Sequence, residues 1–566
     1  MTFKAKGNLR HRARTTTALA TIALAVGGYL VMSGTVADPA AGASVNKGLR
    51  ADKLTQASPA GTSKADPAEE AFKGDMLIKV PPAGTSKANL VERILRGEVP
   101  IQVWPVGAPG AEGDDANDLF RSDPQYKDEY NAEGQVDIYG GKTAVEPPRP
   151  PIELGRQQYT SGSYDESNTF FGEKNGLLPG LAVYGDWRTA IAYNDNAGDD
   201  IAQVATRVNV DIDLKLTGTE RIHAFFTPLQ EDAQFTRYEF GGGGADKEFN
   251  FEYDLEPQTL FFEGDIGSIF AGATGEYASF DLPFTVGLYP LFLQNGIWAN
   301  DAILGGALTL PAKNSSLLNL SNFDITFFAA FEDIDNPGVL NFDGQVDNNE
   351  TYLYGVTAFI DAFSGYIETG YGLLHGVDDQ DGLLTHFVTA AYTRRWSDTL
   401  SNSTRVFANF GNENGQDIEG FAVISENSLI SGLPSTLIPY ANFFVGVGSP
   451  RPLVSADGLL KNVGINFETD ALTGFPALDD TGSNTFGGAL GLQYLFNLDQ
   501  QIVVELAMVQ PFGDPEVGAE DPQYAVGFRY QLPITRAWLI RADATYQFLE
   551  ESDDSAGARF EVRRKF

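Results

Sequence analysis

The chain has 566 residues, of which 43% are hydrophobic and 12% aromatic, a formal net charge of −37 and no cysteine. So acidic a surface repels the phosphate backbone of DNA and RNA, which argues against nucleic acid as a partner. Without cysteine, disulfides, thiolate metal sites and covalently attached haem are excluded. No cofactor is expected.

The first 43 residues have the features of a secretory signal peptide. A basic start precedes an apolar run from Ala18 to Met32, and the small residues Ala41-Gly42-Ala43 offer a cleavage site. An uncleaved inner-membrane anchor is the alternative, although the run is shorter than the roughly 20 residues of a spanning helix. Because no other stretch could span a bilayer as a helix, later insertion would have to use strands.

Residues 44–151 are polar and rich in Pro, Gly and Ala, and we expect a flexible periplasmic segment with two short helices. The phrase PAGTSKA occurs at 59–65 and again at 82–88, and each copy precedes a helical signal. We interpret the repeat as linker chemistry, with a docking element for a periplasmic partner as the alternative. Residues 152–180 are expected to connect this segment to the next domain.

From 181 to 566 the pattern changes to strands separated by turn residues. The clearest strand runs from Val204 to Leu216, where apolar side chains alternate with Arg, Asn, Asp and Lys without interruption. Such alternation places an apolar medium on one face and a wet, charged medium on the other. A soluble β-sandwich or a transmembrane barrel could supply both. The strand is long enough to cross a bilayer, since about 9 to 11 residues suffice at barrel tilt.

The fold class expected is all-β: an antiparallel transmembrane β-barrel of roughly 16 to 18 strands with a mostly irregular N-terminal periplasmic segment. Abundant aromatic residues with a mean hydropathy of −0.17 agree with it. Long acidic connections at 333–350, 376–382 and 470–483 alternate with tight turns, which predicts rims of unequal loop length. Pro283, Pro290 and the apolar run Leu288–Leu293 interrupt the pattern and predict either an inward constricting loop or a kinked strand.

The last eleven residues, AGARFEVRRKF, place Ala558, Phe560, Val562, Arg564 and Phe566 on one face. Together with the signal peptide and the strands, this ending resembles the Gram-negative outer-membrane barrels of porin type, although Arg564 departs from their usual apolar residue. The resemblance covers about 180–566 and does not reach a subfamily; polysaccharide-exporting barrels and diffusion porins look alike at this level. It implies the outer membrane as location, with lipid bilayer and lipopolysaccharide as surroundings, and recognition of the Phe566 strand by the assembly machinery.

If Phe560 and Val562 face lipid, the charged residues between them face the lumen. The same logic, and closure of the barrel between its last and first strands, gives a set of predicted pore-lining residues: Arg207, Asp211, Asp213, Lys215, Glu252, Asp254, Arg529, Arg541, Asp543, Arg559, Glu561 and Arg563. We expect a basic ladder near a carboxylate group, whose transverse field orients polar or charged solutes. The alternative is that these charges pair with one another and only hold the wall together.

Chemistry beyond transport has little support in the sequence. None of His223, His375 and His386 has a neighbouring Asp and Ser that would suggest a catalytic dyad, so no enzyme is expected. The acidic stretch 375–382 lacks the twelfth-position Glu of a calcium-binding EF-hand loop, and we expect a solvated turn and no metal.

The sequence therefore predicts an outer-membrane, porin-like channel for passive passage or export of polar or charged solutes. A loop-closed barrel that serves as an outer-membrane anchor, or as an interaction platform for a periplasmic or surface partner, is the alternative. A soluble secreted β protein is the third possibility.

Overall fold

The computed structural model of the chain describes residues 150–566 except 156–168, 170–171, 232–233, 242–247, 318–319, 338–350, 378–379, 381, 414–415, 434–435, 469–471, 497–499, 514–517 and 551. The predictions for the signal peptide and for the segment with two short helices lie outside the described residues, as do the three aspartates of the acidic stretch 375–382. The predicted connection 152–180 contains one strand, β1 (Ile152–Gly155), which pairs with residues 180–183.

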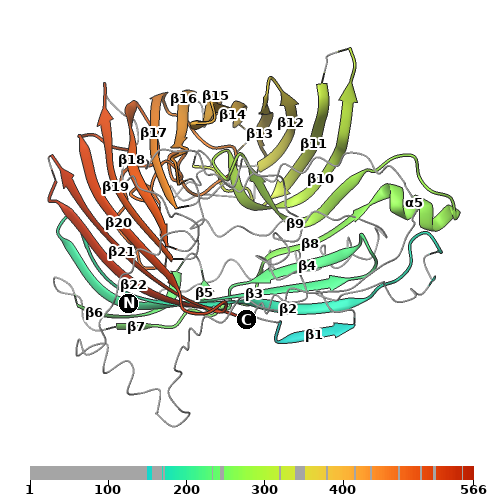
Figure 1. Cartoon of the computed structure of the whole chain (residues 1–566), viewed down its shortest axis with the longest axis horizontal. Helices are drawn as coiled ribbons and strands as arrows, with labels where there is room; N and C mark the ends of the chain where they lie inside the picture. The colour runs from blue at the N-terminus through green and yellow to red at the C-terminus, as the bar shows by residue number, and fades with distance from the viewer. Residues whose placement is uncertain are drawn as a thin grey trace, which may run out of the picture. The chain divides into compact units, whose positions relative to one another are not determined.

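The described chain closes into an antiparallel β-barrel with 18 strand positions in its wall (Figure 1). Each strand pairs with the next, and the last pairs with the first, with Glu561 opposite Ala190. The wall is formed by β2 (Gly180–Asn196), β3 (Asp199–Lys215), β4 (Arg221–Phe226), β8 (Pro257–Asp265), β9 (Pro283–Leu293), β10 (Ala299–Ser315), β11 (Leu320–Glu332), β12 (Thr351–Ala362), β13 (Gly365–Gly376), β14 (Leu384–Trp396), β15 (Leu400–Glu413), β16 (Gln416–Leu429), β17 (Leu437–Gly448), β18 (Thr485–Phe496), β19 (Gln500–Pro511), β20 (Gln523–Pro533), β21 (Trp538–Leu549) and β22 (Ser555–Lys565). The all-β class and the number of strands predicted from sequence are confirmed.

Two wall positions are shared between shorter strands. The lower half of β3 pairs with β4, whereas its upper half pairs with β6 (Gln234–Gly241), so β4 and β6 together make one crossing. The two-residue strand β5 (Gln230–Glu231) lies between them and pairs with the start of β6. In the next position, β7 (Glu248–Asn250) pairs with β6 and β8 pairs with β4.

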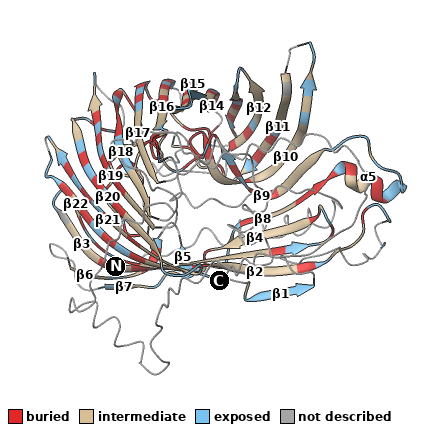
Figure 2. Cartoon of the chain, in the orientation of Figure 1, coloured by how far each residue is buried: buried red, intermediate tan, exposed pale blue. Residues whose placement is uncertain are grey.

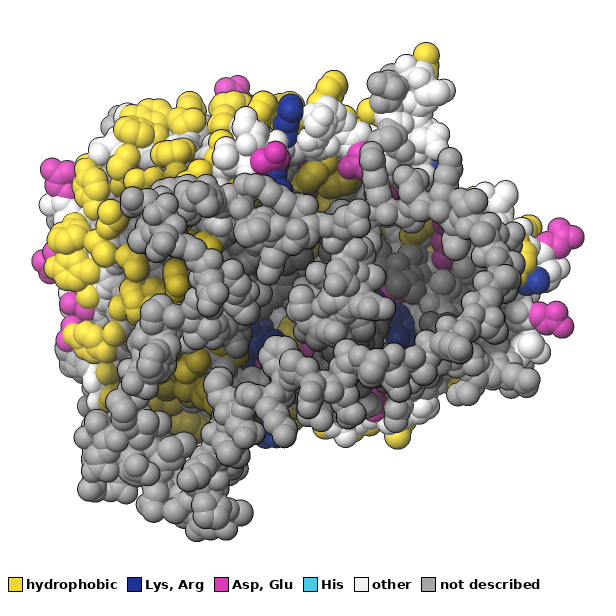
Figure 3. Space-filling view, viewed as in Figure 1, with side chains coloured by type: hydrophobic (Ala, Val, Ile, Leu, Met, Phe, Trp, Pro, Cys, Tyr) yellow, Lys and Arg dark blue, Asp and Glu magenta, His cyan; other side chains and the backbone are white. Residues whose placement is uncertain are grey.

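Side chains alternate between the two faces of the wall. In β19, Val503 and Glu505 are 5% and 0% exposed, whereas Val504 and Leu506 are 45% and 55% exposed. The same banding follows the neighbouring strands (Figure 2), and hydrophobic side chains gather on the flank formed by β18–β22 (Figure 3). The outer face is therefore apolar, as a strand in contact with lipid requires. Its exposed members include Ile191, Phe327, Tyr354, Val388, Phe410, Phe421, Phe443, Val445, Phe486, Leu490, Leu506, Val526, Phe528, Tyr546 and Phe560.

The two rims differ in their connections. We call the rim that carries Phe566 the lower rim, where Phe363-Ser364 and Ser397-Asp398 have the positive φ values typical of tight hairpin turns. The helix α5 (Ile266–Thr274) also belongs to this rim and is capped by Asp265, whose Oδ1 accepts a hydrogen bond from the Ser268 N–H at 2.8 Å. The longest connections, 333–350 and 449–484, leave the upper rim. Among the described residues, no helix is long and apolar enough to cross a membrane.

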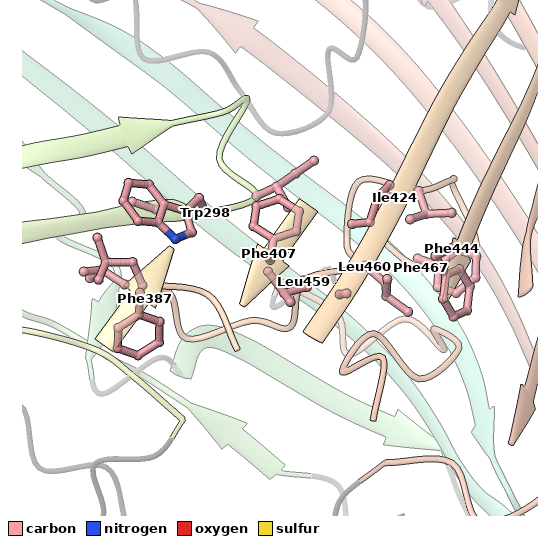
Figure 4. Close-up of a cluster of buried hydrophobic side chains, with 14 of the residues drawn as sticks. Trp298, Phe387, Phe407, Ile424, Phe444, Leu459, Leu460 and Phe467 are labelled. Atoms are coloured by element: carbon pink, nitrogen blue, oxygen red, sulfur yellow. The ribbon is translucent and has the colours of Figure 1, made fainter. Parts of the chain in front are cut away.

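A hydrophobic cluster fills part of the barrel interior (Figure 4). Segment 449–484, between β17 and β18, folds inward and brings Leu459, Leu460 and Phe467 against Phe407 and Phe444 of the wall. The acidic stretch 470–483 expected as a connection lies in this segment, which begins earlier than the sequence suggests and whose apolar first half is buried. Residues 288–293 belong to strand β9, so the strand alternative holds there and the inward-loop alternative does not.

We predict that Leu506→Arg destabilises the protein in lipid by about 2–4 kcal/mol, the cost of a cation on the lipid face near the bilayer midplane. The matched control is Leu317→Arg in a lower-rim connection, where the wild-type side chain is 92% exposed and water already surrounds it. Unfolding of both variants by denaturant in liposomes measures the difference. Equal stabilities would contradict the assignment of the outer face to lipid.

Candidate functional site

Three arginines meet one carboxylate on the inner face of the last three strands. The register sets Arg529 of β20 opposite Asp543 of β21, and Asp543 opposite Arg559 of β22. Asp543 accepts hydrogen bonds from Arg529 Nε at 2.7 Å, from Arg541 Nε at 2.8 Å and from Arg559 Nη2 at 2.8 Å. All four side chains are buried. A single carboxylate this crowded by guanidinium groups is held rigidly, because each ion pair is also a charge-assisted hydrogen bond.

The inward segment contributes a second carboxylate to this cluster. Glu468 pairs with Arg529 Nη2 and with Arg541 Nη2, the latter at 3.1 Å. Burial alone would raise the pKa of the Glu468 carboxyl, but the two guanidinium groups outweigh burial and hold that pKa below its usual range. Glu468 therefore stays ionised at neutral pH and attaches segment 449–484 to the wall.

The closing strands carry further ion pairs. Arg188 of β2 makes a bidentate contact with Glu561 of β22, with Nε–Oε1 and Nη2–Oε2 distances of 3.0 and 2.9 Å. Arg563 Nε lies 2.8 Å from Asp186 Oδ2. In register, Arg188 stands between Arg563 and Arg207, so three arginines form a row across β22, β2 and β3. This row lies where the sequence predicts a basic ladder.

Segment 449–484 is fixed to the wall on several sides besides Glu468. Glu505 of β19 accepts the N–H groups of Ile465 and Asn466 at 2.9 and 3.0 Å. Across the closing strands, Gln203 Nε2 donates to the Thr473 carbonyl at 2.7 Å. Buried polar groups of the inner wall thus find hydrogen-bond partners in the backbone of this segment. Further contacts of the same kind come from Asn194, Asn336 and Asn409.

The predicted carboxylates Asp211 and Asp213 lie together near the lower end of β3. His223 of β4 sits between them, with Nε2 3.4 Å from Asp211 Oδ1 and Nδ1 3.1 Å from Asp213 Oδ1. Tyr184 Oη donates to Asp213 Oδ2 at 2.9 Å. The sequence gives no acidic neighbour for His223, because the β3–β4 register that places Asp213 opposite it is not visible in the order of residues.

The remaining predicted pore-lining residues have different surroundings. Arg207 donates to Asn209 Oδ1 at 2.7 Å, and Lys215 is exposed at the end of β3. Glu252 and Asp254 are expected on a strand from Phe249 to Leu255, but the strand ends at Asn250. That strand assignment is wrong because residues 251–256 have no backbone ladder; Glu252 is held by Thr236 Oγ1, and Asp254 Oδ1 accepts the Glu256 N–H at 2.8 Å.

Sequence reasoning missed several charged residues of the inner wall. Arg188 alternates with apolar neighbours exactly as Arg207 does, so the period of two could have identified it. Glu468 could not be found in this way, because it lies outside the strands. The missed residues that pair inside the barrel are Asp186, Arg188, Arg221, Glu263, Glu368, Arg405, Glu426, Glu468 and Glu505.

A closed antiparallel wall with an apolar outer face and a polar, charged inner face defines a transmembrane β-barrel. The assignment rests on the strand pairing and burial of this chain itself.

No protein-family model and no curated protein matches the chain. Among solved structures it is similar to OccK7 (OpdD) of Pseudomonas aeruginosa, with a TM-score of 0.46 and 9% identity, covering 68% of this chain and 98% of that one. The outer membrane protein opdK of Pseudomonas aeruginosa gives a TM-score of 0.43 and 10% identity, covering 68% of this chain and 98% of that one. OccAB4 of Acinetobacter baumannii gives a TM-score of 0.41 and 10% identity, covering 68% of this chain and 98% of that one.

We predict that Glu468→Gln loosens segment 449–484 and raises single-channel conductance in planar bilayers, because an amide cannot replace the charge that two guanidinium groups hold. The control is Glu520→Gln at an exposed position of the upper rim. Because the Glu468 pKa is lowered, the wild-type attachment should persist from pH 8 to about 5 and weaken only in more acidic solution. Equal conductance of wild type and Glu468→Gln would contradict the attachment.

Proposed function

We propose that this barrel is an outer-membrane channel for passive passage or export of small polar or charged solutes, through a lumen that the inward segment 449–484 narrows. The observation that carries the proposal is the separation of surfaces. Large apolar side chains occupy the outer face, whereas buried charges and the inward segment share the inner one. A wall of this kind isolates a polar passage from lipid.

The ion pairs of the closing strands bear on selectivity. Around segment 449–484, the described cations Arg188, Arg529, Arg541, Arg559 and Arg563 are interleaved with the carboxylates Asp186, Glu468, Asp543 and Glu561. Such pairing favours the structural alternative given in the sequence analysis, in which these charges pair with one another and hold the wall together. Fixed charges of both signs also produce a transverse field, which orients a dipolar solute as it passes. Contact of these side chains with solute stays a prediction.

Ion selectivity distinguishes a basic ladder that acts on passing solutes from one that only holds the wall together. We expect the double variant Arg541→Ala, Arg563→Ala to shift the reversal potential in a salt gradient toward cation preference, because two fixed positive charges are lost. Arg394→Ala is the matched control, since that arginine stacks on Trp396 near the lower rim at 4.4 Å from the ring centroid. Unchanged conductance and selectivity in the double variant would make the ladder structural.

The second candidate function is that of a barrel closed by its inward segment. The several attachments of segment 449–484 also favour a loop-closed barrel, which would act as an anchor or as an interaction platform for a periplasmic or surface partner. Liposome swelling with sugars distinguishes the two. Swelling at a rate that depends on sugar size supports a channel; no swelling and no conductance support the closed barrel.

Recognition by the assembly machinery would involve the C-terminal strand. Phe566 directly follows β22, and its backbone exchanges two hydrogen bonds of 2.9 Å with Gly185 of β2, so the terminal residue lies at the point of closure. We expect the strand ending in Phe566 to be the assembly signal, with lipid and lipopolysaccharide around the finished barrel.

A further inference from the structure

The hydrogen-bonded wall is interrupted between β8 and β9. These strands pair from Asp265–Pro283 up to Leu260–Leu288 and no further. Continued in the same register, the ladder would set Gln258 opposite Pro290. Instead, residues 289–293 pair only with β10, on their other side. In Figure 1 the two strands can be followed to where β9 continues beside β10. We call the facing edges, residues 251–258 and 289–293, the seam.

The sequence itself prevents backbone hydrogen bonds between β8 and β9 from continuing along the seam. Pro257 and Pro290 have no N–H to give to a facing strand. On β8, Phe226 pairs with Pro257 and Phe225 with Thr259, so Gln258 is an extra, bulged residue. Above it, the Glu256 N–H is already bonded to the Asp254 side chain. The interruption is therefore a property of these residues.

Exposed apolar side chains border the seam on both edges. Register connects Phe560 through Ile191, Val204 and Tyr238 to Phe249, two residues before the seam begins. Below Phe249, the exposed side chains on one edge are Phe251 (61%), Tyr253 (53%) and Leu255 (57%). On the other edge, Phe292 is 52% exposed beside Pro290.

An unpaired backbone in a barrel wall needs an occupant. Free N–H and C=O groups do not face hydrocarbon, and irregular backbone is tolerated in a membrane only where protein or a water-filled cavity adjoins it. Partners for the backbone at the seam must therefore come from other protein groups or from water, while the exposed rings of Phe251, Tyr253 and Phe292 offer apolar surface beside it. A molecule with a polar head and an apolar chain matches both sides of such an opening.

The surroundings of the seam are acidic. Glu252, Asp254 and Glu256 belong to the edge formed by residues 251–258, where the rings of Phe251 and Tyr253 stack on each other. Glu256 is close enough to Asp333 to act on its charge. Asp301 and Asp335 stand nearby, the Asp301 Oδ2 accepting the Asp335 N–H at 3.1 Å. Among the described residues of both edges of the seam there is no Lys or Arg. A cationic head group is therefore the complementary one.

We propose that the seam is a lateral binding site for a single-chain amphiphile with a cationic head, whose ammonium group sits against the carboxylates beside the seam while its alkyl chain passes between β8 and β9 into the bilayer. This inference does not rest on the proposed channel function, since a barrel that conducts no ions could still bind lipid-like molecules through its wall.

The test uses the full-length protein in lipid nanodiscs and dodecyltrimethylammonium with a diazirine at the chain end. We expect photolabelling to concentrate on residues 251–258 and 289–293. Because the chain has no cysteine, the pair Gln258→Cys and Pro290→Cys can be bridged cleanly with a short bis-maleimide, and bridging should abolish the labelling. The control pair, Leu506→Cys and Val526→Cys, lies on two hydrogen-bonded strands of the wall, and bridging it should change nothing.

Substitutions provide a second route that needs no bridge. Tyr253→Ala with Phe292→Ala should reduce labelling, whereas Phe528→Ala elsewhere on the outer face should not. Labelling spread evenly over the outer face, or unchanged after bridging, would overturn the proposal. Equal labelling by the carboxylate of the same chain length would overturn the choice of head group. Protection of the seam until residues 44–149 are removed, or cross-links across it between two copies, would show a protein occupant in place of the amphiphile.

Discussion

The structure depends on one constraint: within a bilayer every backbone N–H and C=O needs a partner. Closure of β22 against β2 removes the edge that an open sheet would present, and Phe566 completes the ladder at Gly185. Where β22 ends, β1 takes over as the partner of β2, and where β4 ends, β6 takes over as the partner of β3. The seam between β8 and β9 is the place where this succession of partners stops. The need to pair every backbone group, which explains why the barrel closes, therefore also makes the unpaired seam between β8 and β9 stand out.

The inner wall is stabilised by a different balance. Buried arginines would be costly unless paired, and the strands alone do not supply enough carboxylates for Arg529 and Arg541. Glu468 of the inward segment adds one. In return, that segment gains polar anchors at Glu505 and Gln203 and an apolar one at the Phe467 cluster. Wall charge and constriction are therefore coupled, and a change in one is expected to alter the other.

Which side chains face the inside of the barrel was largely predictable from the alternation of apolar and polar residues along each strand. Alternation along Val204–Leu216 predicts which side chains face inward, and Arg529, Arg541 and Asp543 follow by the same reasoning. Register is not encoded in that period, so the convergence on Asp543 and the placing of His223 between two aspartates could not be derived. The inward segment was missed although Leu453, Leu459 and Phe467 are too apolar for a rim loop. The acidic stretch 470–483 that follows them is typical of a solvated connection and masks this signal in the sequence.

The central claim is that one face of each strand touches lipid and the other does not. Nitroxide labels placed singly at positions 503–508 of β19 test it directly, since the chain has no cysteine to interfere. The account predicts that lipid-soluble oxygen relaxes labels at 504, 506 and 508 strongly, and those at 503, 505 and 507 weakly. Equal accessibility at all six positions, or strong relaxation by a water-soluble nickel complex at the even ones, would contradict it.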